Sequence, residues 1–202
     1  MTLAFGVTFD YLCPWARNVH DHVITALRGG AEWQVDFVPY SLAQGHVSDD
    51  ETPIWDRPEP FRESGILALA TGLYVRDHLP EQFLDVHEAL FAVRHELGLD
   101  IKDPQSIAKQ LSTLGLDGES IVANASTPAM VEQLAREHQA AVNDHDVWGV
   151  PTLIGASRSV FVRVMDRPNG DAETARQRIE HLIELVNSHM VLHEFKETVL
   201  AK

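Results

Sequence analysis

The chain has 202 residues, 45% hydrophobic and 23% charged, which is enough for one globular core carrying a sizeable insertion. Thirty acidic and sixteen basic side chains give a net charge of −14 with neutral histidines, which disfavours binding to nucleic acids and anionic membranes. No apolar run approaches the roughly 18–20 residues that span a bilayer, and the first residues lack the basic region of a secretory leader. We therefore expect a cytoplasmic protein that contacts neither membrane nor nucleic acid.

The first forty residues are predicted to form a strand, a helix and a second strand. Residues 3–9 alternate large apolar side chains with small ones, as in a strand buried on both faces. Apolar residues recur at helical spacing over residues 14–27, and a Gly-Gly pair then ends the helix. Residues 33–37 alternate apolar and polar side chains, which indicates a second strand parallel to the first.

The middle of the chain is predicted to be helical throughout. Residues 41–60 contain three prolines and an acidic cluster with no periodicity, as expected of a loop at a domain boundary. Residues 61–145 carry apolar stripes at helical spacing, and the pairs Asp103-Pro104 and Thr127-Pro128 are typical helix starts. We interpret this segment as an inserted all-helical subdomain.

Strands return near the end. Residues 150–155 and 159–164 are rich in β-branched and aromatic side chains around a short turn, which predicts a hairpin. Asp171 then starts a last amphipathic helix, whose apolar positions extend to Met190. The predicted order is strand, helix, strand, a helical insertion, two strands and a helix.

Two short motifs frame the insertion. The first, "TFDYLCPWARN" (residues 8–18), places the sequence Cys-Pro-Trp-Ala where the first strand meets the first helix. The second, "DVWGVPTL" (residues 146–153), resembles the Gly-Val-Pro-Thr loop of thioredoxin-fold oxidoreductases. In this order and at this separation, the motifs resemble the DsbA-like oxidoreductase family. Its branches include FrnE-type proteins, mycothiol-dependent nitroreductases, and kappa-class glutathione transferases with 2-hydroxychromene-2-carboxylate isomerases.

The resemblance implies an α/β, thioredoxin-like fold. Residues 1–60 and 146–202 would form the thioredoxin-like domain, with residues 61–145 inserted as helices. It also implies that Cys13 is the catalytic nucleophile and that a cis peptide bond precedes a proline facing it. The residues expected to bind the thiol or substrate are Pro14, Trp15, Trp148, Val150 and Pro151.

The cysteine chemistry can be argued from the residues themselves. A thiol attacks as its thiolate, and the N–H groups and dipole at a helix N-terminus favour the negative sulfur, so we expect the pKa of Cys13 to be lowered. Arg17, one turn further, is either a solvated side chain or a source of positive potential. Trp15 either covers the sulfur and offers a ring to a ligand or belongs to the core.

Ala16 occupies the position of the second cysteine in Cys-Pro-x-Cys members. The chain has one cysteine, so it cannot complete a dithiol cycle alone. Three alternatives remain. The preferred one is a single-cysteine oxidoreductase that uses an external low-molecular-weight thiol, glutathione or mycothiol, to reduce a disulfide or a small electrophile. The others are a kappa-class-like isomerase or transferase that uses a bound thiol, and a non-catalytic thiol- or peptide-binding protein.

Other cofactor classes have no support in the sequence. The eleven histidines lack metal-ligand spacing, so we interpret them as solvated or capping side chains and expect no metal. The sequence contains neither a Gly-x-Gly-x-x-Gly motif nor a phosphate-binding Walker loop. The expected partners are a small thiol and a small-molecule or disulfide substrate, and the oligomeric state stays open between monomer and homodimer.

Overall fold

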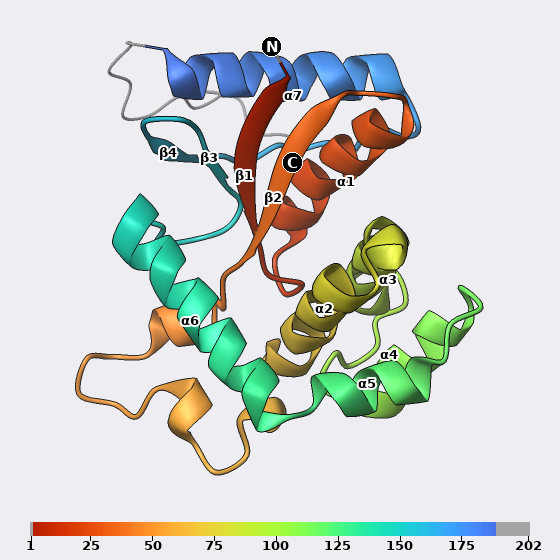
Figure 1. Cartoon of the computed structure of the whole chain (residues 1–202), viewed down its shortest axis with the longest axis vertical. Coiled ribbons are helices and arrows are strands. Elements are labelled where there is room, and N and C mark those ends of the chain that lie inside the picture. The colour runs from red at the N-terminus through yellow and green to blue at the C-terminus, as the bar shows by residue number, and fades with distance from the viewer. Residues whose placement is uncertain (1, 189–202) are drawn as a thin grey trace.

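The computed structural model describes residues 2–188 (Figure 1). These residues form a four-stranded sheet, two helices beside it, and five helices that lie in the chain between the second and third strands. In chain order the elements are β1 (Leu3–Phe9), α1 (Pro14–Arg28), β2 (Trp33–Pro39), α2 (Ile66–His78), α3 (Phe83–His95), α4 (Pro104–Ser112), α5 (Gly118–Ala125), α6 (Pro128–His145), β3 (Thr152–Ile154), β4 (Ser159–Phe161) and α7 (Ala172–Asn187). Short 3-10 turns lie at Gln44–His46, Ile54–Asp56, Pro60–Arg62 and Pro80–Gln82.

The sheet has the strand order β2-β1-β3-β4. β1 and β2 are parallel, whereas β3 pairs antiparallel with both β1 and β4, which confirms the predicted parallel pair and the predicted hairpin. The last two strands are shorter than predicted. After Phe161 only the bond from Val162 N–H to the Pro151 carbonyl continues the pairing, and the chain then turns towards α1, where Asn18 donates to the Val164 carbonyl.

β1 is the centre of the core. Its residues from Phe5 to Phe9 are buried on both faces, as the sequence pattern predicts, whereas the edge strand β2 alternates between more buried and exposed positions. Gly6 pairs with Ile154, and a Cβ at Gly6 would lie 3.1 Å from the Ile154 Cβ. α1 and α7 pack on each other beside this sheet (Figure 1).

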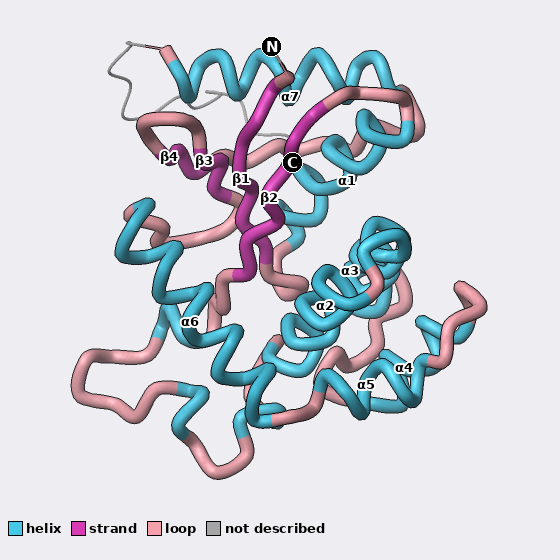
Figure 2. Tube along the Cα trace, in the orientation of Figure 1, coloured by secondary structure: helices cyan, strands magenta, loops and turns pink. Residues whose placement is uncertain are grey.

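Helices α2 to α6 lie between β2 and β3 in the chain and form a group at one end of the sheet (Figure 2). The predicted helix starts at Asp103-Pro104 and Thr127-Pro128 are correct. The sequence interpretation gave α5 no bounds of its own within the predicted helical segment. α5 packs so tightly on α4 that a Cβ at Gly118 would clash with the Ala108 carbonyl. The last predicted apolar position of the final helix, Met190, lies outside the described residues.

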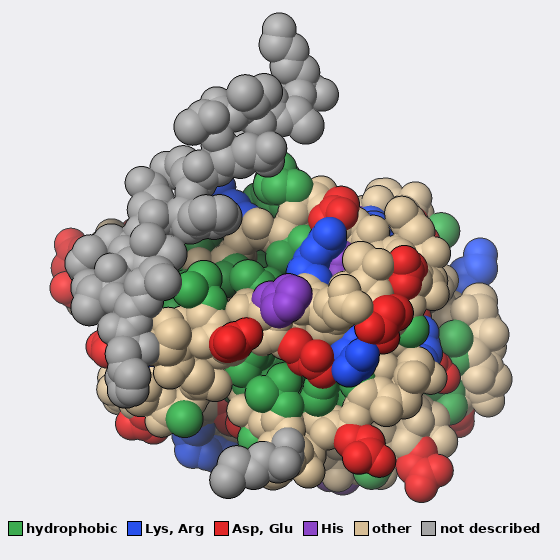
Figure 3. Space-filling view, turned by 90° about the horizontal axis from the view of Figure 1, so that it is seen from above, with side chains coloured by type: hydrophobic (Ala, Val, Ile, Leu, Met, Phe, Trp, Pro, Cys, Tyr) green, Lys and Arg blue, Asp and Glu red, His purple; other side chains and the backbone are tan. Residues whose placement is uncertain are grey.

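The outer surface carries mixed charge. Acidic and basic side chains are interspersed on the α7 side of the molecule, so among the described residues this face offers no continuous basic surface to a polyanion (Figure 3). Within residues 2–188, no helix is long and apolar enough to cross a bilayer.

Candidate active site

Cys13 lies at the N-terminus of α1, directly after β1. It is the N-cap residue: its Sγ accepts a hydrogen bond from the Ala16 N–H at 3.4 Å, and its own N–H donates to the Asp10 carbonyl at 3.0 Å. Pro14 occupies the first helical position, where a missing N–H costs no intrahelical bond. The first strand and the helix cap therefore fix the position of the sulfur.

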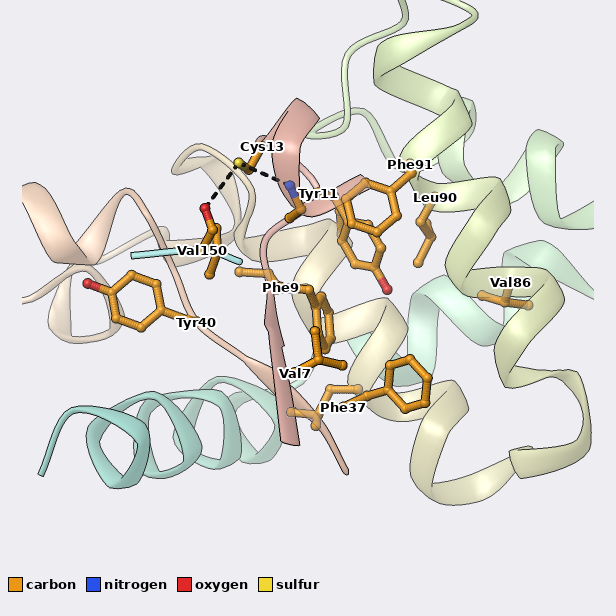
Figure 4. Packing of buried hydrophobic residues seen from close by; sticks show 14 of the residues in the cluster. Val7, Phe9, Tyr11, Cys13, Phe37, Tyr40, Val86, Leu90, Phe91 and Val150 are labelled. Atoms are coloured by element: carbon orange, nitrogen blue, oxygen red, sulfur yellow. Dashed lines mark hydrogen bonds between the residues drawn. The ribbon is translucent and has the colours of Figure 1, made fainter. Parts of the chain in front are cut away.

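The Val150–Pro151 segment lies directly against this sulfur (Figure 4). The peptide bond between Val150 and Pro151 is cis, and the Cys13 thiol donates to the Val150 carbonyl with an Sγ–O distance of 3.3 Å. Thr152 N–H donates to Thr8 Oγ1 at 2.8 Å, which ties the start of β3 to β1. The two motifs thus meet at one place although 137 residues separate them.

Burial raises the pKa of the Cys13 thiol above its ordinary value. The residue is only 6% exposed, and loss of hydration disfavours the thiolate more than the N–H groups of Ala16 and Trp15 stabilise it. The hydrogen bond from the thiol to Val150 acts in the same direction, because only the protonated sulfur can donate it. The expectation of a lowered pKa from the helix N-terminus is therefore wrong for the free chain.

Arg17 contributes little positive potential to the sulfur because it is paired elsewhere. Its guanidinium forms an ion pair with Glu96, and its side chain is only 12% exposed, so the solvated alternative is wrong. The cation that stabilises the Cys13 thiolate is Arg163, just beyond β4, although its effect is smaller than that of burial. Sequence reasoning missed Arg163, since nothing near it in the chain connects it with Cys13.

The residues expected around the sulfur differ in exposure. Pro14 is exposed, Trp15 is half-buried against the core, and Val150 and Pro151 are buried. Trp148 is 70% exposed, and its ring packs on Phe161 of β4 with centroids 4.6 Å apart. The alternation of β4 was the only sequence signal for Phe161.

Asp10 organises the loop beneath Cys13. One carboxylate oxygen accepts the Leu12 N–H at 2.9 Å and the other accepts the Leu42 N–H at 2.8 Å. Burial raises the pKa of Asp10 to about 6, against the lowering effect of these two hydrogen bonds. The side chain therefore joins the Cys13 loop to the end of β2.

A line of buried hydrogen bonds starts in the loop before Cys13, passes through α3 and α1, and ends on β1. The Tyr11 hydroxyl and His87 Nδ1 are 2.7 Å apart, His87 Nε2 and His20 Nδ1 are 2.8 Å apart, and His20 Nε2 lies 3.1 Å from the Thr8 carbonyl oxygen. A carbonyl can only accept, so His20 donates to Thr8, His87 donates to His20, and Tyr11 donates to His87. This line ends at a carbonyl and holds its groups in one arrangement.

The line requires neutral histidines. Burial lowers the pKa of His20 to about 4 and that of His87 well below its ordinary value. A third buried imidazole, His138, accepts the Ser41 N–H, and burial lowers its pKa to about 4. The interpretation of the histidines as solvated or capping side chains is wrong for these three and for His22, which is also buried, because their ring nitrogens bond to polar groups inside the protein.

A polar cavity lies apart from Cys13, and residues 2–188 contain no metal cluster. The described residues contain no group of three or more His, Cys, Asp or Glu that could hold a metal ion. A polar cavity of about 510 Å³ lies between α1, α3 and the segment before α7. Its charged side chains pair with one another, Asp21 with Arg167 and Arg28 with Glu88, and Cys13 does not line it.

The fold and the site define a thioredoxin-like protein. A cysteine follows β1, a cis-proline loop faces it, and five helices lie in the chain between β2 and β3. The DSBA-like thioredoxin domain model matches residues 6–179, and the chain belongs to this family. No curated protein matches it at the sequence level.

Solved structures share this fold at low sequence identity. The cytosolic disulfide reductase DsbM from Pseudomonas aeruginosa, determined with GSH, is 13% identical with a TM-score of 0.62, over 90% of this chain and 100% of that one. A 2-hydroxychromene-2-carboxylate isomerase is 13% identical with a TM-score of 0.63, over 91% and 97%. A single-residue variant of DsbA from Pseudomonas aeruginosa is 18% identical with a TM-score of 0.56, over 90% and 87%. The fold thus occurs in a disulfide reductase and in an isomerase.

Proposed function

We propose that this protein is a single-cysteine thiol–disulfide oxidoreductase that takes its second thiol from solution. The observation that carries the proposal is the 3.3 Å contact between Cys13 Sγ and the Val150 carbonyl, which joins a sulfur at a helix N-terminus to a backbone acceptor. In the free chain the thiol occupies that acceptor. A substrate backbone N–H that takes over the Val150 carbonyl removes the interaction that favours the protonated sulfur.

The reaction proceeds by two thiol exchanges that balance. The Cys13 thiolate attacks one sulfur of the substrate disulfide, a new S–S bond to Cys13 forms, and the other sulfur leaves as a thiolate that takes up the proton Cys13 has lost. An external thiol then attacks this mixed disulfide and restores Cys13. These two exchanges leave one substrate sulfur as a free thiol and the other in a disulfide with the external thiol, and the protein is unchanged. A second external thiol then displaces that substrate sulfur, so complete reduction of one substrate disulfide oxidises two external thiols to their own disulfide.

The external thiol is a low-molecular-weight one, glutathione or mycothiol. The presence of GSH in the DsbM structure supports a small thiol as partner, and the single cysteine supports a cytoplasmic, reducing setting. We further infer that residues 1–60 and 146–202 act as the catalytic domain and residues 61–145 as the insertion that covers it. Cys13, Pro14, Trp15, Trp148, Val150 and Pro151 are the residues assigned to the site.

A second candidate is an isomerase or transferase in which the bound thiol's own sulfur reacts. The raised pKa of Cys13 favours it, because a protonated sulfur can hold a ligand without attacking it. A Cys13→Ser protein separates the two candidates. It loses disulfide reduction under our proposal, whereas it retains turnover if the bound thiol does the chemistry. A protein that forms a mixed disulfide at Cys13 but turns over neither substrate type is the non-catalytic binding alternative.

The direct test restores the missing cysteine. In the wild type, glutathione disulfide should leave a glutathionyl adduct on Cys13 that persists until free thiol is added. In Ala16→Cys, the new thiol lies one helical turn away and should expel glutathione as an internal disulfide, so the adduct's lifetime falls at least about tenfold. Intact-protein mass spectrometry against time measures both.

Ala156→Cys is the matched control, because Ala156 is exposed beyond the opposite end of β3 from Pro151. A thiol there should leave the Cys13 adduct as long-lived as in the wild type. Failure of the wild-type protein to form any adduct, with Cys13 still alkylated in the unfolded chain, would overturn the proposed function.

A further inference from the structure

Three side chains form a cluster near the Val150–Pro151 turn in the chain and in the sheet. Trp148 is two residues before Val150, and Phe161 lies on β4 opposite Thr152. The Trp148 and Phe161 rings are 4.6 Å apart at an interplanar angle of 33°, and the Arg163 guanidinium carbon lies 5.4 Å from the centre of the Phe161 ring. We call Trp148, Phe161 and Arg163 the aromatic–arginine cluster.

Arg163 differs from most arginines of the chain. Within residues 2–188 eight arginines form ion pairs with carboxylates, namely Arg17, Arg28, Arg57, Arg62, Arg76, Arg167, Arg176 and Arg178. Arg163 has no carboxylate partner among the described residues, although the chain has thirty acidic side chains. Arg163 is exposed, and its guanidinium instead lies over the Phe161 ring. Its positive charge also lowers the pKa of Cys13 slightly.

Like Arg163, Trp148 has a side chain that is exposed to solvent. It is 70% exposed, the largest exposed fraction among the large hydrophobic side chains described, and its packing on Phe161 holds the ring in place. Flat rings bind aromatic groups by offset stacking, and a free guanidinium binds carboxylates through paired N–H groups. A stacking surface and an unpaired cation therefore lie together around Phe161, and Trp148 is two residues before Val150, whose carbonyl accepts the Cys13 thiol.

We propose that the aromatic–arginine cluster is a substrate subsite for a planar aromatic group that carries an anionic substituent. This inference rests on the proposed function, because it specifies which disulfides or electrophiles reach Cys13. The ring of the ligand stacks on Trp148 and its anionic group pairs with Arg163. The net charge of −14 makes a local cation necessary, since the molecule as a whole repels anions.

The test compares three small disulfides that differ in one property each. Dithiobis-nitrobenzoate has an aromatic ring with a carboxylate, dithiodipyridine has an aromatic ring without charge, and hydroxyethyl disulfide has neither. Second-order rate constants with Cys13 are measured for each at one pH. Because the same thiolate attacks all three, a change in its fraction multiplies every rate equally, and the ratios between reagents report recognition alone.

We expect Arg163→Gln to lower the ratio of the anionic to the neutral aromatic rate at least about threefold, the size of one charge-assisted contact at an exposed position. Trp148→Leu should lower both aromatic rates about fivefold relative to hydroxyethyl disulfide. Arg136→Gln, which removes an exposed arginine of α6, controls for net charge and should leave every ratio unchanged.

The outcomes separate the inference from the function on which it rests. Equal ratios in the wild type, Arg163→Gln and Arg136→Gln, with Cys13 still reactive, would overturn the subsite and leave the oxidoreductase proposal intact. An effect of Arg163→Gln without one of Trp148→Leu would reduce the subsite to a site for anions alone and would also contradict the inference. Absence of reaction with all three disulfides would instead contradict the proposed function.

Discussion

Two opposing effects act on the sulfur of Cys13. The cap position offers N–H groups that favour a thiolate, and the sequence shows this position plainly. Burial under the Val150–Pro151 turn removes water from the same atom, and that loss is the larger effect. A helix N-terminus activates a cysteine only where the sulfur also keeps its hydration or gains a cation.

The apparent pKa of Cys13 in the free protein should therefore lie above the roughly 8.5 of an ordinary thiol. The rate of iodoacetamide alkylation, followed by mass spectrometry across pH, should still rise above pH 8.5. Glutathione treated with the same reagent provides the reference titration. A rate that reaches its plateau below pH 8 would contradict the assignment of burial as the dominant effect.

Helix α2 packs closely against the loop that carries Cys13 and thereby limits the positions of Tyr11. Gly72 of α2 packs against the Tyr11 hydroxyl so closely that a Cβ there would lie 2.2 Å from the hydroxyl oxygen. Tyr11 is therefore held by α2 on one side and by its hydrogen bond to His87 of α3 on the other. The insertion thereby helps to position the residue two places before Cys13.

Gly72→Ala should lower the free energy of unfolding by about 1–3 kcal/mol, as overpacking does, although alanine favours a helix interior by up to about 1 kcal/mol. In a Tyr11→Phe background the hydroxyl is absent and only ring-carbon contacts of 3.0 and 3.1 Å remain, so the same substitution should cost less. Urea unfolding of the wild type, both single variants and the double variant measures the coupling. An equal effect in both backgrounds would mean that the hydroxyl contact is not the cause.

Local sequence patterns locate the starts of most helices in the middle of the chain. Asp103 and Thr127 mark helix starts through local chemistry, and the structure places both as predicted. α5 also starts with a local signal, because the Asp117 carboxylate caps it by accepting the Ser120 N–H, but the sequence interpretation passed over this short helix. The division into residues 1–60 with 146–202 and the insertion 61–145 stays a prediction.

For the whole molecule, buried histidines and Asp10 make stability depend on pH in opposite directions. A histidine with a native pKa below its unfolded value contributes stability above about pH 6.5, and this is lost as the pH falls towards about 4. His20 and His138 each account for about 3 kcal/mol. Asp10, with its pKa raised to about 6, favours the native state at low pH, and that contribution is lost as the pH rises from about 4 to 6.

The histidines outnumber the carboxyl, so the free energy of unfolding should fall by at least about 3 kcal/mol between pH 7 and pH 4. Asp10→Asn removes the opposing contribution and should make this fall steeper, by up to about 3 kcal/mol. Urea unfolding at several pH values tests both, with the exposed Asp36→Asn as control. A flat profile, or a shallower one in Asp10→Asn, would contradict these pKa assignments.

The sequence by itself determined the order of elements, the parallel pairing of the first two strands and the cap at Cys13. Each of these depends on residues a few places apart, whose spacing is visible in the chain. The tertiary structure alone decided that burial raises the pKa of Cys13, that His20 and His87 are internal, and that the charge of Arg163 acts on the sulfur. Desolvation and Coulomb interactions act through space between residues distant in sequence, so no local pattern encodes them.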